Sequence, residues 1–166
     1  MVFSSLTFIY LFLPLSLIFH YLTPNKIFRN ISLTAFSLAF YAWEEPLWIF
    51  LMIFTAIFDY FMALLIERWK GDFKAKIILL ITIIINLSLL IFYKYGGFLY
   101  DNLSELGELP FGRPTNSLPV GISFYTFMVI SYIVDVYRGE LKAQKNPLNF
   151  LMFISLFQHL VAGPIV

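Results

Sequence analysis

The chain has 166 residues, of which 60% are hydrophobic and only 13% are charged. Soluble domains carry roughly a quarter charged residues, so this composition excludes an ordinary soluble domain and predicts a polytopic membrane protein. The net charge is only +1 and the basic residues are dispersed, which argues against nucleic-acid binding. The absence of cysteine excludes disulfides, thiolate metal sites and thiol catalysis.

The hydropathy pattern predicts an all-α transmembrane bundle that forms one continuous domain over residues 1–166. The N-terminus has neither a basic region nor a small-residue cleavage site, so the first apolar segment is expected to remain in the protein as a span. Pro14 is expected to kink it, because proline cannot donate a backbone hydrogen bond. Only Glu44, Glu45 and Pro46 separate the second and third segments, which predicts a tight hairpin. The six expected segments are 3–22, 30–43, 47–66, 75–93, 118–137 and 147–166.

The distribution of lysine and arginine predicts the orientation of the bundle. Three alternate loops, 23–29, 67–76 and 138–146, together hold nine basic residues, whereas the opposite side holds only Lys94 and Arg113. Because cytoplasmic loops carry an excess of basic residues, the nine-residue side is expected to face the cytoplasm and the N-terminus to face outward. The protein is therefore expected in the cytoplasmic (inner) membrane.

The outer loop, 94–117, is moderately apolar and rich in glycine and proline. Two interpretations stay open for it. Phe98, Leu99 and Tyr100 could lie in the membrane interface, or the segment could be an ordinary external loop.

Polar residues within the third and fourth segments are candidates for a cavity. Ionisable side chains in a span are costly and normally face the bundle interior or a water-filled cavity. Asp59 shares a helix face with Thr55, and it is either a cavity-lining carboxylate or an anchor bonded to a neighbouring helix or to an arginine. Asn86 shares a stripe with Thr82 and Tyr93, which is typical of polar contacts between membrane helices.

The stretch LPVGISFYTFMVISYIVDVYRGE, residues 118–140, carries much hydrogen-bonding chemistry for a span. Ser131, Asp135 and Arg138 fall on one helix face, and this polar face is expected to be buried against other helices. An Asp135–Arg138 pair could fix the helix end or bind a partner helix, but arginine does not give up its proton and cannot serve as an acid–base partner. Gly121 is expected to allow a bend or a close approach of backbones.

The last apolar segment contains Gln158 and His159 deep within it, and both are candidate cavity residues. Asn146 is expected to cap its helix with Pro147 in the first turn, and Gly163-Pro164 to break it. A lone histidine is more often a packing residue than a ligand. His20 and His159 lack the spacing of a metal site, so no metal is expected.

Several of these motifs carry a resemblance. Residues 118–140, the run that ends in FQHLVAGPIV, the stretch IFYKYGGFLYDNL and the N-terminal FSSLTFIYLFLPLSLIFHYL are similar to the membrane-bound O-acyltransferase superfamily. The nearest branch is the bacterial alginate O-acetyltransferase type, which includes peptidoglycan O-acetyltransferases and the D-alanyl transferase of teichoic acids. The resemblance extends over essentially the whole chain.

The resemblance implies a multi-span enzyme whose helices surround a tunnel through the membrane. Such enzymes pass an acyl group from a cytoplasmic donor, such as acetyl-CoA, towards an exported acceptor, often with a periplasmic or membrane-anchored partner. No cofactor is implied within the chain. The family's catalytic histidine lies downstream of the AGPI motif, so His159 is not the catalytic position and none of these residues is assigned a catalytic role. We therefore expect a truncated, inactive N-terminal part of the enzyme, and an apolar C-terminus supports that expectation.

Two other classes of protein fit the same residues. Polar groups in spans and a broken helix also occur in transporters and flippases, although these often show an internal repeat and none is found here. A non-catalytic remnant is the third possibility. The sequence does not identify the acceptor polysaccharide, the acyl donor or the oligomeric state.

Overall fold

The computed structural model describes residues 5–104 and 119–157. All regular structure within these residues is helical, which confirms the all-α prediction. A π-helical turn, η1 (Phe8–Phe12), leads into α1 (Leu13–Leu22), so the backbone changes its hydrogen bonding just before Pro14. The other helices are α2 (Lys26–Glu44), α3 (Trp48–Arg68), α4 (Phe73–Ser104), α5 (Ile122–Arg138) and α6 (Pro147–Ser155).

Two helices in the described part of the chain are long and apolar enough to cross a bilayer: α3 and the Phe73–Asn102 portion of α4. A third apolar stretch, Phe8–Leu22, is shorter. The expectation that the other helices also cross the membrane, and the direction of each crossing, stay predictions.

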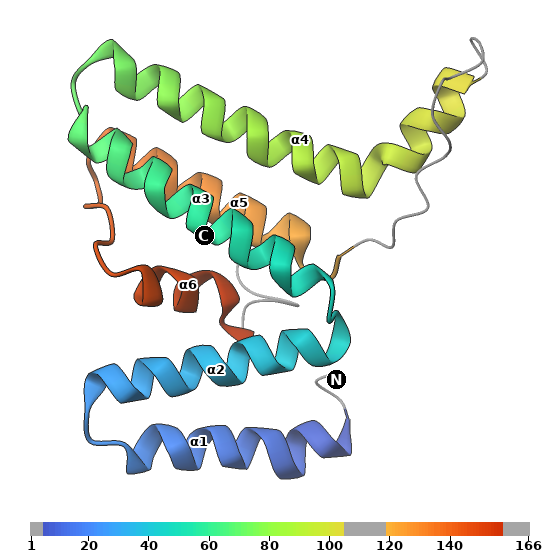
Figure 1. The fold of residues 1–166 in the computed structure, drawn as a ribbon, viewed down its shortest axis with the longest axis vertical. Coiled ribbons are helices and arrows are strands. Elements are labelled where there is room, and N and C mark those ends of the chain that lie inside the picture. The colour runs from blue at the N-terminus through green and yellow to red at the C-terminus, as the bar shows by residue number, and fades with distance from the viewer. Residues whose placement is uncertain (1–4, 105–118, 158–166) are drawn as a thin grey trace.

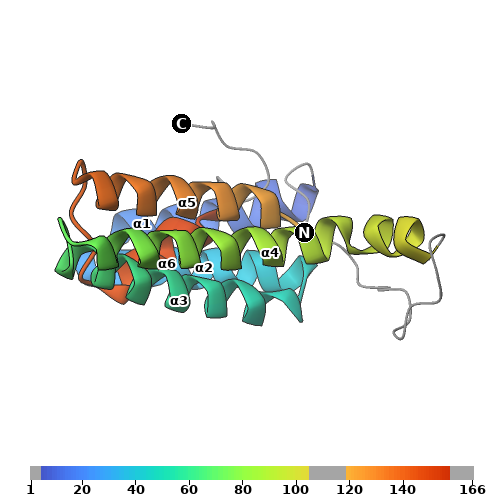
Figure 2. The ribbon, with the colours of Figure 1, turned by 90° about the horizontal axis from the view of Figure 1, so that it is seen from above.

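The helices lie side by side in a layered bundle (Figure 1). Helices α3, α4 and α5 pack on one another, α6 lies between α3 and α2, and α1 packs on the outer side of α2. Figure 2 shows that α4 extends well past the end of its neighbours. The links α1–α2, α3–α4 and α5–α6 meet at one end of the bundle, which we call the basic end because its exposed lysines include Lys70, Lys76, Lys142 and Lys145.

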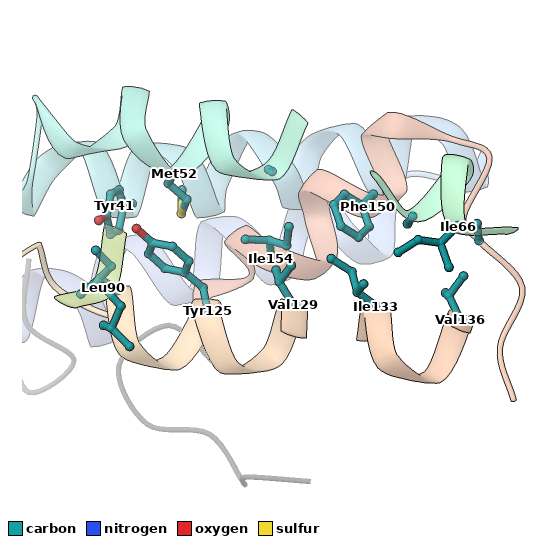
Figure 3. Close-up of a cluster of buried hydrophobic side chains, with 14 residues drawn as sticks. Tyr41, Met52, Ile66, Leu90, Tyr125, Val129, Ile133, Val136, Phe150 and Ile154 are labelled. Carbon is teal, nitrogen blue, oxygen red and sulfur yellow. The ribbon is translucent and has the colours of Figure 1, made fainter. Parts of the chain in front are cut away.

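The main core runs along the inner faces of α3, α5 and α6. Ile133 and Val136 of α5 meet Ile66 of α3 near the basic end, and Val129 lies beside Ile154 of α6 (Figure 3). Tyr41, Met52 and Tyr125 form the opposite end of the same cluster. These residues fix α3 and α5, which carry the candidates Asp59, Ser131, Asp135 and Arg138.

Phenylalanines from three distant parts of the chain form a second core. The Phe12 ring lies 5.5 Å from the Phe40 ring and 5.5 Å from the Phe157 ring, and Phe8 stacks on Phe12 at the same centroid distance. Aromatic pairs favour centroid separations of this size. The cluster holds the π-helical turn against α2 and the end of α6.

Several boundaries differ from the predicted segments. Helix α2 begins at Lys26 rather than at residue 30, because the Asn25 side chain accepts a hydrogen bond from the Ile27 amide and caps the helix. The turn between α2 and α3 is tight, as predicted. However, α2 packs mainly against α6 rather than against α3.

Helix α4 continues past residue 93, where a loop was expected, to Ser104. Gly96 and Gly97 do not end it, because a glycine costs a helix only about 1 kcal/mol. Side-chain hydrogen bonds support its last turns, from Asn102 to the Phe98 carbonyl and from Ser104 to the Asp101 carbonyl. The prediction of a loop from Lys94 onward is therefore wrong at least as far as Ser104.

The last predicted segment is not one continuous helix. Helix α6 ends at Ser155, and Leu156 has a non-helical backbone. The amide of Phe157 donates to the Ser37 hydroxyl at 3.3 Å, which directs the Phe157 ring into the second core. The expected break at Gly163-Pro164 lies outside the described residues.

Candidate functional site

A buried polar contact joins α3 to α4. The Asn86 side-chain amide donates to Asp59 Oδ1 at 2.7 Å and to the Thr82 carbonyl at 3.0 Å. Asp59 is 1% exposed, and Thr82 and Asn86 are also buried. Asp59 therefore has the arrangement of an anchor bonded to a neighbouring helix, and the predicted Thr82–Asn86 stripe does lie at a helix–helix contact.

The second carboxylate oxygen of Asp59 is buried and has no hydrogen-bond partner among the described residues. Thr55, on the same face, donates instead to the carbonyls of its own helix, at 3.1 Å to Leu51 and 3.0 Å to Met52. A buried polar atom without a partner is costly. Asp59 Oδ2 is therefore the atom of this contact that remains available to another group.

A second polar contact holds the turn before α5. The Tyr41 hydroxyl of α2 donates to the Val120 carbonyl at 3.2 Å. Gly121 has φ +78°, a left-handed conformation that glycine adopts without strain, so the predicted bend is confirmed. The Tyr125 hydroxyl is buried near Tyr41 and has no partner among the described residues (Figure 3).

The polar face of α5 does not pack against the bundle. Ser131 and Arg138 are exposed and Asp135 is half-buried, whereas the buried face consists of apolar residues together with Tyr125 and Thr126. Within the described residues this polar face is therefore not buried against other helices, and its role as a cavity lining stays a prediction. Close packing of aliphatic side chains determines which face turns inward.

The described residues also contain no Asp135–Arg138 ion pair. The Asp135 carbonyl, in contrast, accepts the amides of Gly139 and Glu140 at 2.9 and 3.0 Å and so ends the helix.

We expect Asp135→Asn to change the free energy of unfolding by less than about 0.5 kcal/mol, because it removes no side-chain contact. Chemical denaturation of the purified chain in detergent checks this, and a loss of more than about 2 kcal/mol would show a structural partner for the carboxylate.

Side chains that were not singled out in the sequence hold the α5–α6 link. The Tyr60 hydroxyl donates to the Lys145 carbonyl at 2.8 Å, and the Glu67 carboxylate accepts the Ala143 amide at 3.2 Å. The Tyr132 hydroxyl accepts the Gln144 amide at 2.8 Å. Tyr60 and Glu67 are seven residues apart, a spacing that places both on one face of α3. This spacing is the feature of the sequence that could have indicated a shared partner for the two side chains.

The predicted cap of α6 is confirmed. Asn146 accepts the Leu148 amide at 3.0 Å, and Pro147 lies in the first turn. The candidates Gln158 and His159 lie outside the described residues. His20 is in the last turn of α1, with its ring edge-on to Tyr21. Within residues 5–104 and 119–157, no three histidine, aspartate or glutamate side chains gather as a metal site would require.

Comparison with known proteins finds O-acetylases and an O-acetyltransferase that are similar to the whole chain. The probable alginate O-acetylase AlgI of Pseudomonas aeruginosa is 38% identical over 180 residues, covering 100% of this chain and 33% of that protein. The same enzyme of Azotobacter vinelandii is 38% identical over 180 residues, covering 100% of this chain and 34% of that protein. The peptidoglycan O-acetyltransferase of Helicobacter pylori is 29% identical over 194 residues, covering 100% of this chain and 37% of that protein.

No family profile matches the chain, and no solved structure matches it. The chain spans about a third of the length of the curated relatives that it matches. The similarity to these relatives nevertheless extends from one end of the chain to the other, as the motifs predicted. The chain is therefore homologous, over its full length, to about a third of the probable alginate O-acetylases.

Proposed function

We propose that this chain forms the N-terminal part of a membrane O-acetyltransferase that modifies an exported cell-surface polysaccharide, such as alginate or peptidoglycan. The observation that carries the proposal is the 38% identity to alginate O-acetylases along the whole chain. The acyl donor is a cytoplasmic acyl carrier of the acetyl-CoA class. A periplasmic or membrane-anchored acetyltransferase is the expected partner that receives the acyl group.

The arrangement of the helices supports a location in the cytoplasmic membrane. Helices α3 and α4 are long and apolar enough to span it, and the three basic links meet at one end of the bundle. The positive-inside rule assigns that end to the cytoplasm. The donor then arrives at the basic end, and the acceptor side is the end where α4 projects.

The polar atoms without partners suggest where an acyl path could run. Asp59 Oδ2 and the Tyr125 hydroxyl are buried between helices and lack hydrogen-bond partners among the described residues. With Asn86 they are the proposed lining of the donor path, and the sequence alone adds Gln158 and His159 as further proposed lining residues. Ser131, Asp135 and Arg138 are proposed to face further helices of the complete enzyme.

The chain alone is expected to catalyse no acyl transfer. Transfer to a hydroxyl requires a general base, most often histidine. The chain has two histidines. His20 lies at the end of α1 beside Tyr21, without a carboxylate partner among the described residues. The family resemblance implies that His159 is not the catalytic position. The Asp59–Asn86 contact holds a single carboxylate, which is not an acid–base pair.

The test is to replace the matching third of the P. aeruginosa alginate O-acetylase with this chain, in a strain that lacks its own enzyme. We expect the hybrid to restore acetyl groups to alginate and the 166-residue chain alone to restore none. Membrane extraction and immunoblotting control for the insertion of both proteins. An inserted hybrid without activity, or acetylation by the chain alone, would contradict the proposal.

A further inference from the structure

A groove of about 530 Å³ lies at the basic end, between the α3–α4 turn and the last turns of α5. Its floor and walls combine charged and aromatic side chains from segments distant in the sequence. Tyr137 comes from α5, and the rest comes from the turn and the first residues of α4. The lining residues are Lys70, Gly71, Asp72, Phe73, Lys76 and Tyr137.

The groove has an excess of uncompensated positive charge. Lys70 and Lys76 are exposed, and neither has a carboxylate partner among the described residues. Asp72 also lines the groove, but its carboxylate is turned towards the start of α4, where it accepts the Lys74 amide at 3.5 Å. The Lys74 ammonium is engaged elsewhere, 3.9 Å above the Trp69 ring. Two cations are therefore free to meet an anion in the groove.

The position of Lys70 depends on the end of α5. Gly139 has φ +83°, and a Cβ atom at this position would collide with Nζ and Cε of Lys70. The absence of a side chain at Gly139 thus lets the lysine lie across the helix end. This contact connects the α3–α4 turn to α5 and holds one cation at the edge of the groove.

Apolar surface adjoins the charges. Phe73 is 71% exposed, and Ile77, one turn along α4, is 42% exposed. A free phosphate or nucleotide would gain little from these side chains, whereas a lipid presents an anionic headgroup and apolar chains together. Basic pockets at the cytoplasmic ends of membrane helices bind anionic headgroups in this way.

We propose that this groove binds the headgroup of an anionic phospholipid, with its phosphate between Lys70 and Lys76 and its acyl chains along Phe73 and Ile77. The inference rests on the membrane location given under the proposed function, but it requires no acyl transfer. Lipid binding and acetylation are measured separately, so the failure of one is distinguishable from the failure of the other.

The test uses the purified 166-residue chain in mild detergent, titrated with phosphatidylglycerol or with phosphatidylcholine of the same acyl chains. Native mass spectrometry counts the bound lipids. The variant is K70Q/K76Q, and the matched control is K142Q/K145Q, which removes the same charge from exposed lysines at the same end but outside the groove. D72N changes the charge of the groove in the opposite direction, since asparagine keeps the helix cap while removing the negative charge.

We expect K70Q/K76Q to lower the preference for phosphatidylglycerol on the order of 25-fold, since each lysine near an anionic headgroup contributes roughly fivefold. The control should keep the preference, and D72N should raise it. An equal loss of this preference in K70Q/K76Q and in K142Q/K145Q would show that the lipid is attracted by the overall charge and not by the groove, and would overturn the proposal. Displacement of the lipid by inorganic phosphate or a nucleotide at comparable concentration would also overturn it, because it would show a site for free phosphate.

Discussion

Replacing Asn86 by leucine is expected to lower the free energy of unfolding by about 2 kcal/mol, because it leaves a buried carboxyl without a partner. The amide of Asn86 lies 2.7 Å from Asp59 Oδ1, and the other Asp59 oxygen already lacks a partner among the described residues. Hydrogen bonds between membrane helices average below about 1 kcal/mol. Most of the expected loss therefore comes from the unpaired carboxyl rather than from the lost bond.

A double-mutant cycle separates these two contributions. Asp59→Leu combined with Asn86→Leu removes both polar groups, so the double variant should be more stable than Asn86→Leu alone. Denaturation of the purified chain in detergent, followed by far-ultraviolet circular dichroism, supplies the four free energies. Additive losses would contradict the contact as the structure has it. Thr55→Val, which breaks only bonds within α3, is a matched control.

Replacing Gly139 by alanine is expected to destabilise the chain by about 1–2 kcal/mol, for two reasons. An L-residue in the left-handed conformation costs about 1 kcal/mol, and the added methyl group would displace Lys70. The same substitution at Gly71 is the matched control. Gly71 has φ +88° but open space around its Cβ position, so only the backbone cost applies there.

The difference between the two glycine variants isolates the displacement of Lys70. Gly139→Ala should therefore be the more destabilising of the two, and Lys70→Ala introduced beside it should remove the excess. Thermal unfolding in detergent measures each variant. Equal losses at both glycines, with no effect of Lys70→Ala, would show that Lys70 is not held against Gly139.

Local signals in the sequence predicted the structure well where one residue and its neighbours decide the outcome. The cap at Asn146 and the bend at Gly121 follow from backbone chemistry alone. Asp59 and Asn86 were each singled out as buried polar groups, and both are buried. Their pairing could not be predicted, because one sequence does not tell which faces of two helices meet.

Predictions failed where packing between distant segments decides the outcome. Within the described residues, Val129, Ile133 and Val136 rather than the polar face of α5 fill the space against α3 and α6. Arg138 is exposed at the end of α5, where a charge costs little, and Ser131 is exposed in the middle of the helix. Helix α6 ends early because Phe157 joins phenylalanines from η1 and α2, a contact that hydropathy does not encode.

The basic end of the bundle must face the cytoplasm if the acyl donor and the lipid headgroup both bind on that side. Single cysteines are clean probes because the chain has none of its own. With a membrane-impermeant thiol reagent outside intact cells, we predict that cysteines at Lys70 and Lys142 resist labelling and that a cysteine at Ser104 reacts. Labelling at Lys70 and Lys142 with protection at Ser104, while all three react in opened cells, would show that the basic end faces outward.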